Sequence, residues 1–117
     1  MPLITVYTSA EPPPDEKAQS FLRDLSSTFA QLLGKPERYV MTRLAPRSRM
    51  TFAGSPDPAC YVEIKSIGGI TRENASRLTE AACKAVHRGI GVPTNRTYVI
   101  LYDVPAHMWG LDGSTFG

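Results

Sequence analysis

The sequence predicts a two-layer α+β fold, in which two βαβ units form one four-stranded mixed sheet with two helices on one face. Two segments carry apolar residues at helical spacing, and four short segments are rich in β-branched and aromatic residues. The order strand, helix, Gly, Pro, strand occurs twice, over about residues 1–58 and 59–117. A chain of 117 residues suits a single domain, and each crossover makes its two flanking strands parallel.

The first half begins with a predicted strand over residues 3–8. Three prolines at positions 12–14 and two acids after them then favour the start of a helix. Gly34 and Pro36 end this helix, and residues 39–45 are predicted to form the second strand. The apolar stripe of the helix consists of Ala18, Phe21, Leu22, Leu25, Phe29, Leu32 and Leu33.

The second half repeats this order. Residues 59–67 are predicted to form a strand that ends at Gly68 and Gly69. Thr71 is predicted to cap a second helix, which Gly89 and Pro93 end. Residues 97–102 form the predicted fourth strand, and the tail adds short strands. The apolar side of the second helix holds Leu78, Ala81, Ala82, Ala85 and Val86.

Composition excludes several classes of protein. Hydrophobic residues make up 42% of the chain, too many for long disorder, and no apolar run reaches the ~18–20 residues of a membrane span. A net charge of +2 does not indicate a nucleic-acid partner. Cys60 and Cys83 form neither a CxxC pair nor a zinc set, and neither histidine has neighbours at metal-ligand spacing, so we expect no metal site. The N-terminus lacks a targeting signal, which predicts a cytoplasmic protein.

One face of the predicted sheet has no helix to cover it. The predicted strands carry apolar residues on both sides, among them Val6, Met41, Val62 and Val99. An exposed apolar sheet face requires a partner. The sequence therefore predicts an oligomer whose interior is lined by sheets.

Pro2 is the most informative single residue for chemistry. A small second residue generally permits removal of the initiator Met, which leaves the secondary amine of proline at the chain terminus. Burial or a nearby cation lowers the pKa of such an amine, so that a neutral Pro2 nitrogen can act as a general base near pH 7. The alternative is that Pro2 is merely the second residue and has no chemical role.

Several motifs, in this order and spacing, make the chain resemble the macrophage migration inhibitory factor family. The similarity runs from Pro2 to Phe116, essentially the whole chain. The motifs are Pro2 opening a strand, Gly34-Lys35-Pro36 before Tyr39-Val40, residues 50–55 with Asp57-Pro58, Ser66-Ile67-Gly68-Gly69, Arg96 to Tyr98, and Gly113-Ser114-Thr115-Phe116.

The resemblance implies a tautomerase-superfamily fold and a homotrimer with sheets around a central channel. It also implies cofactor-independent keto–enol tautomerisation of aryl pyruvates such as phenylpyruvate, and in many members activity on D-dopachrome. The implied base is Pro2. The implied substrate contacts are Lys35 and the backbone near Ser66 and Ile67 for the carboxylate, Tyr98 from a neighbouring subunit, and Tyr39 and Phe116 as apolar walls.

The sequence departs from the family pattern in three respects. Ile100 stands where a pocket Asn is frequent, which removes one polar contact expected for D-dopachrome. Cytokine members carry a small aliphatic residue at the position of Trp109 and an aromatic residue at the position of Leu111. The bulky group at the pocket mouth thus changes place in this chain, so we include Trp109 among the substrate-binding candidates. The CxxC pair of vertebrate cytokine members is absent, because the third strand begins Ala59-Cys60-Tyr61-Val62.

Two other functions stay open. The first is a cytokine-like signalling or binding protein with a vestigial pocket and a receptor partner. Family cytokines leave cells without a signal peptide, so the N-terminus does not separate this function from an enzyme. The second is a related superfamily activity, such as dehalogenation or decarboxylation. It requires further arginines or acids in the pocket, and the sequence places none there; the strand-associated Arg43 and Arg96 can be tested by substitution.

Overall fold

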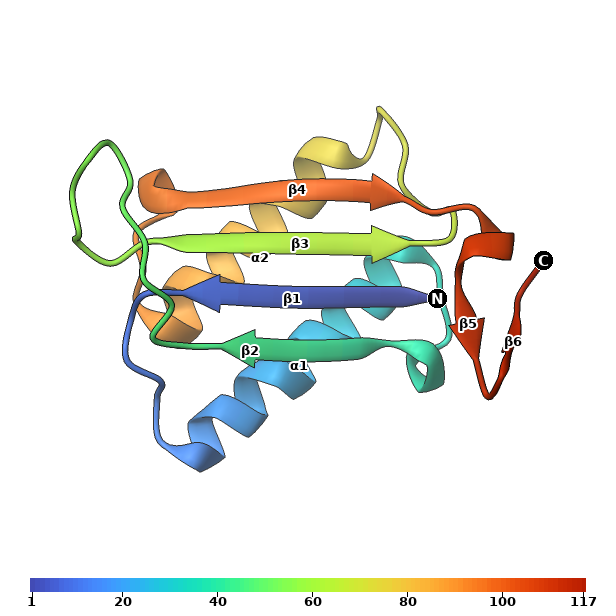
Figure 1. Ribbon diagram of the computed structural model, residues 1–117, viewed down its shortest axis with the longest axis horizontal. Helices are drawn as coiled ribbons and strands as arrows, with labels where there is room; N and C mark the ends of the chain where they lie inside the picture. The colour runs from blue at the N-terminus through green and yellow to red at the C-terminus, as the bar shows by residue number, and fades with distance from the viewer.

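The computed structural model describes residues 1–117 and contains one four-stranded sheet, two long helices and a short C-terminal hairpin (Figure 1). The first half holds β1 (Pro2–Thr8), α1 (Asp15–Leu33), the 3₁₀ turn η1 (Glu37–Tyr39) and β2 (Met41–Ala45). The second half holds β3 (Cys60–Ser66), α2 (Ala75–Ile90), η2 (Thr94–Arg96), β4 (Thr97–Asp103), η3 (Ala106–Met108), β5 (Gly110–Leu111) and β6 (Ser114–Thr115).

The sheet has the strand order β2-β1-β3-β4. Strands β1 and β2 are parallel, as are β3 and β4, whereas the central pair β1 and β3 is antiparallel. Both helices lie behind the sheet in Figure 1, and the face toward the viewer carries none. The predicted mixed sheet with two helices on one face is therefore confirmed. Neither helix is both long and apolar enough to cross a membrane.

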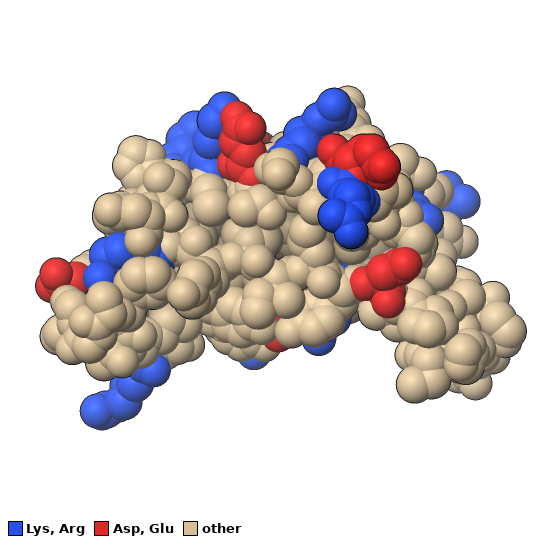
Figure 2. Space-filling view, turned by 90° about the horizontal axis from the view of Figure 1, so that it is seen from above, with Lys and Arg blue, Asp and Glu red and all other residues tan.

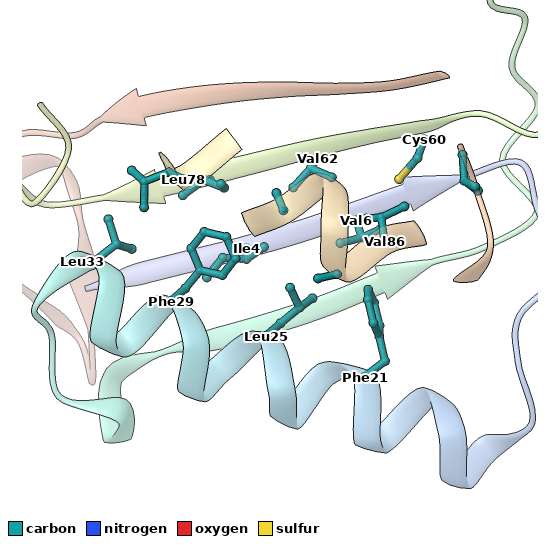
Figure 3. Packing of buried hydrophobic residues seen from close by; sticks show 14 residues of the cluster. Ile4, Val6, Phe21, Leu25, Phe29, Leu33, Cys60, Val62, Leu78 and Val86 are labelled. Atoms are coloured by element: carbon teal, nitrogen blue, oxygen red, sulfur yellow. The ribbon is translucent and has the colours of Figure 1, made fainter. Parts of the chain in front are cut away.

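The hydrophobic core lies between the sheet and the helices (Figure 3). Successive strand residues point to opposite faces, so alternate positions of β1 and β3 enter the core. Ile4, Val6, Val62 and Ile64 are all fully buried. From the helices, the apolar stripes predicted from the sequence supply Phe21, Leu25, Phe29 and Leu33 of α1 and Leu78, Ala82, Ala85 and Val86 of α2.

The predicted boundaries of the second helix were wrong at both ends. Thr71 does not begin the helix: it exchanges two hydrogen bonds with Asn74, and α2 starts at Ala75 after this turn. Gly89 lies inside α2, and Gly91 ends the helix in a left-handed conformation. A Cβ at position 89 would overlap the ring of the buried Phe21, so this glycine serves close helix packing rather than termination.

The open face of the sheet is less apolar than predicted. Of the four residues named from these strands, Val6 and Val62 are buried in the core, Val99 packs against the core, and only Met41 is largely exposed. The open face instead combines tyrosines with charged groups. The ring of Tyr7 stacks on Tyr61 at 5.6 Å, with the guanidinium of Arg43 5.7 Å from the Tyr7 ring centre.

Charged side chains also gather elsewhere. In the view onto the β4 edge, they lie mostly on the side of the helices, and the projecting hairpin is largely uncharged (Figure 2). The ion pair between Lys84 and Glu80 of α2 belongs to this polar helical surface. The largely uncharged hairpin is a surface that an oligomer can bury at low desolvation cost.

We expect Gly89→Ala to destabilise the protein by about 1–2 kcal/mol, because overpacking against Phe21 outweighs the gain in helix propensity. The measurement is the free energy of unfolding from urea denaturation. Ser76→Ala, an exposed position of the same helix, is the matched control and is expected to be neutral or slightly stabilising. A Gly89→Ala protein as stable as the control would contradict the packing role.

Candidate active site

Pro2 lies at the end of the sheet where the central strand β1 begins and its neighbour β3 ends. Because these strands are antiparallel, Pro2 is directly opposite Ser66, and both are fully buried. The backbone N–H of Ile67 donates a hydrogen bond of 3.3 Å to the carbonyl of Met1. The start of the chain is therefore fixed against the end of β3 rather than left free.

Lys35 reaches the same place from the end of the first helix. Gly34 adopts a left-handed conformation that ends α1, and the Nζ of Lys35 donates a hydrogen bond of 2.6 Å to the carbonyl of Ile67. This contact depends on a close approach between the loop after β3 and α1. A Cβ at Gly69 would lie 2.7 Å from the carbonyl oxygen of Leu33, so a larger residue would force the two apart.

A cavity of about 400 Å³ opens beside Pro2. Its wall is mainly apolar, and a second, smaller hollow next to it contains Lys35 and Ile67. The rings of Tyr39 and Phe116, which border both, meet edge to face at 6.3 Å. The residues lining the larger cavity are Met1, Pro2, Leu3, Arg38, Tyr39, Val40, Met41, Trp109, Gly110, Leu111 and Phe116.

Three parts of the chain that are distant in sequence build this wall. Pro36 precedes the 3₁₀ turn that ends at Tyr39, so this tyrosine does not lie in a strand as predicted, and the strand begins at Met41. The hairpin of β5 and β6 supplies Trp109, Leu111 and Phe116 from the C-terminus. Figure 1 shows this hairpin beyond the end of the sheet at which the N-terminus lies.

The electrostatics favour a neutral amine at the chain terminus. Partial burial lowers the pKa of the Met1 amino group, and the positive charge of Lys35 lowers it further. Both effects disfavour the protonated form. The terminal amine at this end of the sheet is thus neutral at a lower pH than an amine in water, and only a neutral amine can accept a proton.

Seven of the eight residues singled out from the sequence come together here: Pro2, Lys35, Tyr39, Ser66, Ile67, Trp109 and Phe116. Tyr98 does not. It pairs with Tyr61 near the start of β4, whereas Ser66, opposite Pro2, pairs with Asp103 at the other end of that strand. Tyr98 is 65% exposed, so its ring is accessible to another copy of the chain.

Sequence reasoning missed Arg38, Val40 and Met41 in the wall. Arg38 lies 4.8 Å from the ring centre of Tyr39 and is the one side chain with a formal charge in the larger cavity. The position of Arg38 next to Tyr39 is the sequence signal that could have indicated a place in the cavity wall. The two arginines named from the sequence lie outside this cavity. Arg43 is beside Tyr7 on the open sheet face, and Arg96 donates a hydrogen bond to the Pro58 carbonyl in the loop between β2 and β3.

The chain is similar in sequence to known proteins over its whole length. The family model described as macrophage migration inhibitory factor (MIF) matches residues 1–117. The chain belongs to the MIF family. A homologue from Trichuris trichiura is 33% identical over 99% of this chain and its own full length, and the Xenopus laevis protein is 32% identical over 99% of both chains.

Solved MIF structures have the same fold. A homologue from Prochlorococcus marinus has a TM-score of 0.94 and 45% identity, and it covers 98% of this chain and 99% of its own. The Toxoplasma gondii structure has a TM-score of 0.90 and 30% identity, with coverage of 97% and 99%. The chain therefore has the tautomerase-superfamily fold over essentially its whole length, and membership of the MIF family supports an isomerase-type activity in general.

We expect Lys35→Met to raise the pKa of the terminal amine, because it removes a like charge that disfavours protonation. The pKa should stay below its ordinary value, since burial of the amine remains. Titration of the terminal amine by NMR measures this change. Lys17→Met, at the opposite end of α1, is the control and should leave the pKa unchanged; an unchanged pKa in Lys35→Met itself would contradict the coupling.

Proposed function

We propose that this MIF-family protein, once Met1 has been removed, is a cofactor-independent keto–enol tautomerase of aryl pyruvates such as phenylpyruvate, with Pro2 as the general base. One observation carries the proposal: the chain terminus, the Lys35 cation and an apolar cavity lie together at one end of the sheet. A base, a carboxylate anchor and a site for an aromatic ring are the groups this reaction requires.

Removal of Met1 is necessary for the base. While Met1 is attached, the Pro2 nitrogen is a tertiary amide and carries no basic lone pair. Once it is free, this nitrogen takes the proton from the carbon next to the substrate carbonyl, which leaves an enolate. The protonated nitrogen then returns that proton, directly or through water, to the enolate oxygen, which gives the enol and restores the neutral base. A low pKa suits this step, because a general base must be neutral near the working pH.

Removal of Met1 also supplies a donor for the substrate. The backbone N–H of Ile67, now bonded to the Met1 carbonyl, is released when that residue leaves. Lys35 uses one of its three ammonium hydrogens on the Ile67 carbonyl and keeps two for a ligand. A pyruvate carboxylate between these two groups forms charge-assisted hydrogen bonds beside Pro2. Ser66, whose hydroxyl donates to the Gly68 carbonyl at 2.7 Å, holds this turn in shape.

The aromatic end of the substrate occupies the apolar part of the cavity. Tyr39 and Phe116 form one corner, and Trp109 and Leu111 lie at the hairpin side. Such walls exclude water and favour an aryl ring over a small aliphatic group. D-dopachrome is a weaker candidate, because Ile100 supplies no polar side-chain contact.

The proposal includes a homotrimer in which Tyr98 of one subunit completes the site of the next. This arrangement accounts for an exposed tyrosine at the sheet end remote from Pro2, and it covers the open, tyrosine-rich sheet face. The phenolic hydroxyl of Tyr98 supplies a hydrogen-bond donor to the bound substrate.

A cytokine-like signalling protein is the second candidate, because the relatives named above carry the name macrophage migration inhibitory factor. In that case a receptor would be the partner, after secretion without a signal peptide from the cytoplasm, and the pocket would be vestigial. Measurement of tautomerase activity in protein proven by intact mass to begin at Pro2 separates the two functions: activity supports the enzyme, and its absence favours signalling.

We expect Pro2→Gly to lower kcat for phenylpyruvate enolisation by about 100-fold or more, because general base catalysis typically contributes 10²–10⁴-fold. The rate is followed by the absorbance of the enol, and intact mass confirms that Met1 is absent. The oligomeric state by size-exclusion chromatography is the control. Full activity in an intact Pro2→Gly oligomer would exclude Pro2 as the base.

We expect Trp109→Val to shift substrate preference toward larger aryl pyruvates. Replacing the indole by a small side chain widens the cavity beside Phe116, so KM for a naphthyl pyruvate should fall relative to KM for phenylpyruvate. Met108→Val, at an exposed neighbouring position outside the wall, is the matched control. Equal KM ratios in the two variants would place Trp109 outside the substrate site.

A further inference from the structure

Arg96 fastens the loop between β2 and β3 to the start of β4. Its guanidinium group donates hydrogen bonds to four backbone carbonyls of this loop and needs no acidic partner. The acceptors are Pro58 at 2.9 Å from Nε, Phe52 at 3.3 Å from Nη1, and Ser55 at 3.2 Å and Asp57 at 2.9 Å from Nη2. One side chain therefore holds both the tip and the return segment of the loop.

The tip of this loop is a narrow hairpin turn. Phe52 and Ser55 exchange two backbone hydrogen bonds of 3.0 Å each. The two residues between them, Ala53 and Gly54, have positive φ angles of 54° and 74°, as a two-residue type I′ turn requires. The turn leaves little freedom to the backbone of Phe52.

Phe52 lies between Arg96 and Tyr98. The guanidinium of Arg96 is 5.2 Å from the centre of the Phe52 ring, and the Tyr98 ring centre is 5.1 Å from it at an angle of 60°. Figure 1 shows the loop beside the start of β4, at the end of the sheet away from the N-terminus. Since Tyr98 is largely exposed on an edge strand, this ring contact restricts a side chain that would otherwise be mobile.

We propose that Phe52, held by Arg96, is a positioning residue that orients Tyr98 of one subunit for the active site of its neighbour. The inference rests on the proposed function, in which Tyr98 crosses the subunit interface. A tyrosine that is already ordered loses less conformational entropy when substrate binds. The effect therefore falls on KM more than on the proton transfer at Pro2.

The first test compares variants at the loop tip. Phe52→Ala is expected to raise KM for phenylpyruvate about three- to tenfold, the cost of ordering one side chain on binding, with kcat changed by less than about twofold. Phe52→Tyr keeps an aromatic ring and should retain the wild-type KM. Arg96→Lys should raise KM as Phe52→Ala does, because one ammonium group cannot donate to four carbonyls. Thr51→Ala, exposed in the same loop, is the control.

The second test asks whether Phe52 acts across the interface. Oligomers are assembled from Pro2→Gly subunits and Phe52→Ala subunits that carry different affinity tags. In the mixed oligomers, the free Pro2 of a Phe52→Ala subunit can face Tyr98 of a subunit with an intact Phe52. Such sites should show the wild-type KM, although neither parent oligomer does.

The outcomes are separable. A wild-type protein that begins at Pro2 and is inactive overturns the proposed function and this inference together. An active wild type with an unchanged KM in an intact Phe52→Ala oligomer overturns the inference alone. Mixed oligomers that keep the raised KM of the Phe52→Ala parent also overturn it, because Phe52 would then act within its own subunit.

Discussion

The backbone hydrogen bonds between β1 and β3, which run antiparallel at the centre of the sheet, determine where the candidate site can lie. This pairing puts the first residues of the chain against Ser66 and Ile67 at the end of β3. Had the two strands been parallel, Pro2 would face the start of β3 instead, remote from Lys35. The direction of the strands therefore decides which charged group lies near the terminal residue.

Close packing of the loops then brings the cation to the terminus. Helix α1 lies on the sheet through its buried stripe, and its left-handed end at Gly34 turns the chain so that Lys35 faces Ile67. Gly69 permits the opposing loop to come near the Leu33 carbonyl. The pKa of the terminal amine is lowered first by burial of the amine and then by this Lys35 cation, which the helix packing holds in place.

The two ends of the sheet carry different parts of the proposed machinery. One end holds Pro2, Lys35 and the C-terminal hairpin, and the other holds Tyr98 with the loop that Arg96 fastens. A single subunit cannot bring these ends together, because the strands between them are rigid. In the proposed trimer, neighbouring copies join these ends around the open sheet face, and the mixture of tyrosines and charges on that face suits an interior that is partly hydrated.

The sequence by itself determined the four strands, the two amphipathic helices and most candidate residues, because apolar periodicity and the positions of Gly and Pro are local properties. It could not determine that Gly89 packs against Phe21 inside a helix, that Tyr39 ends a 3₁₀ turn, or that Arg38 and Met41 join the cavity wall. Those features depend on which segments face each other across the fold. Strand order, which makes β1 and β3 the antiparallel pair at the centre of the sheet, also came only from the tertiary structure. The residue pattern within one strand does not indicate which other strand pairs with it.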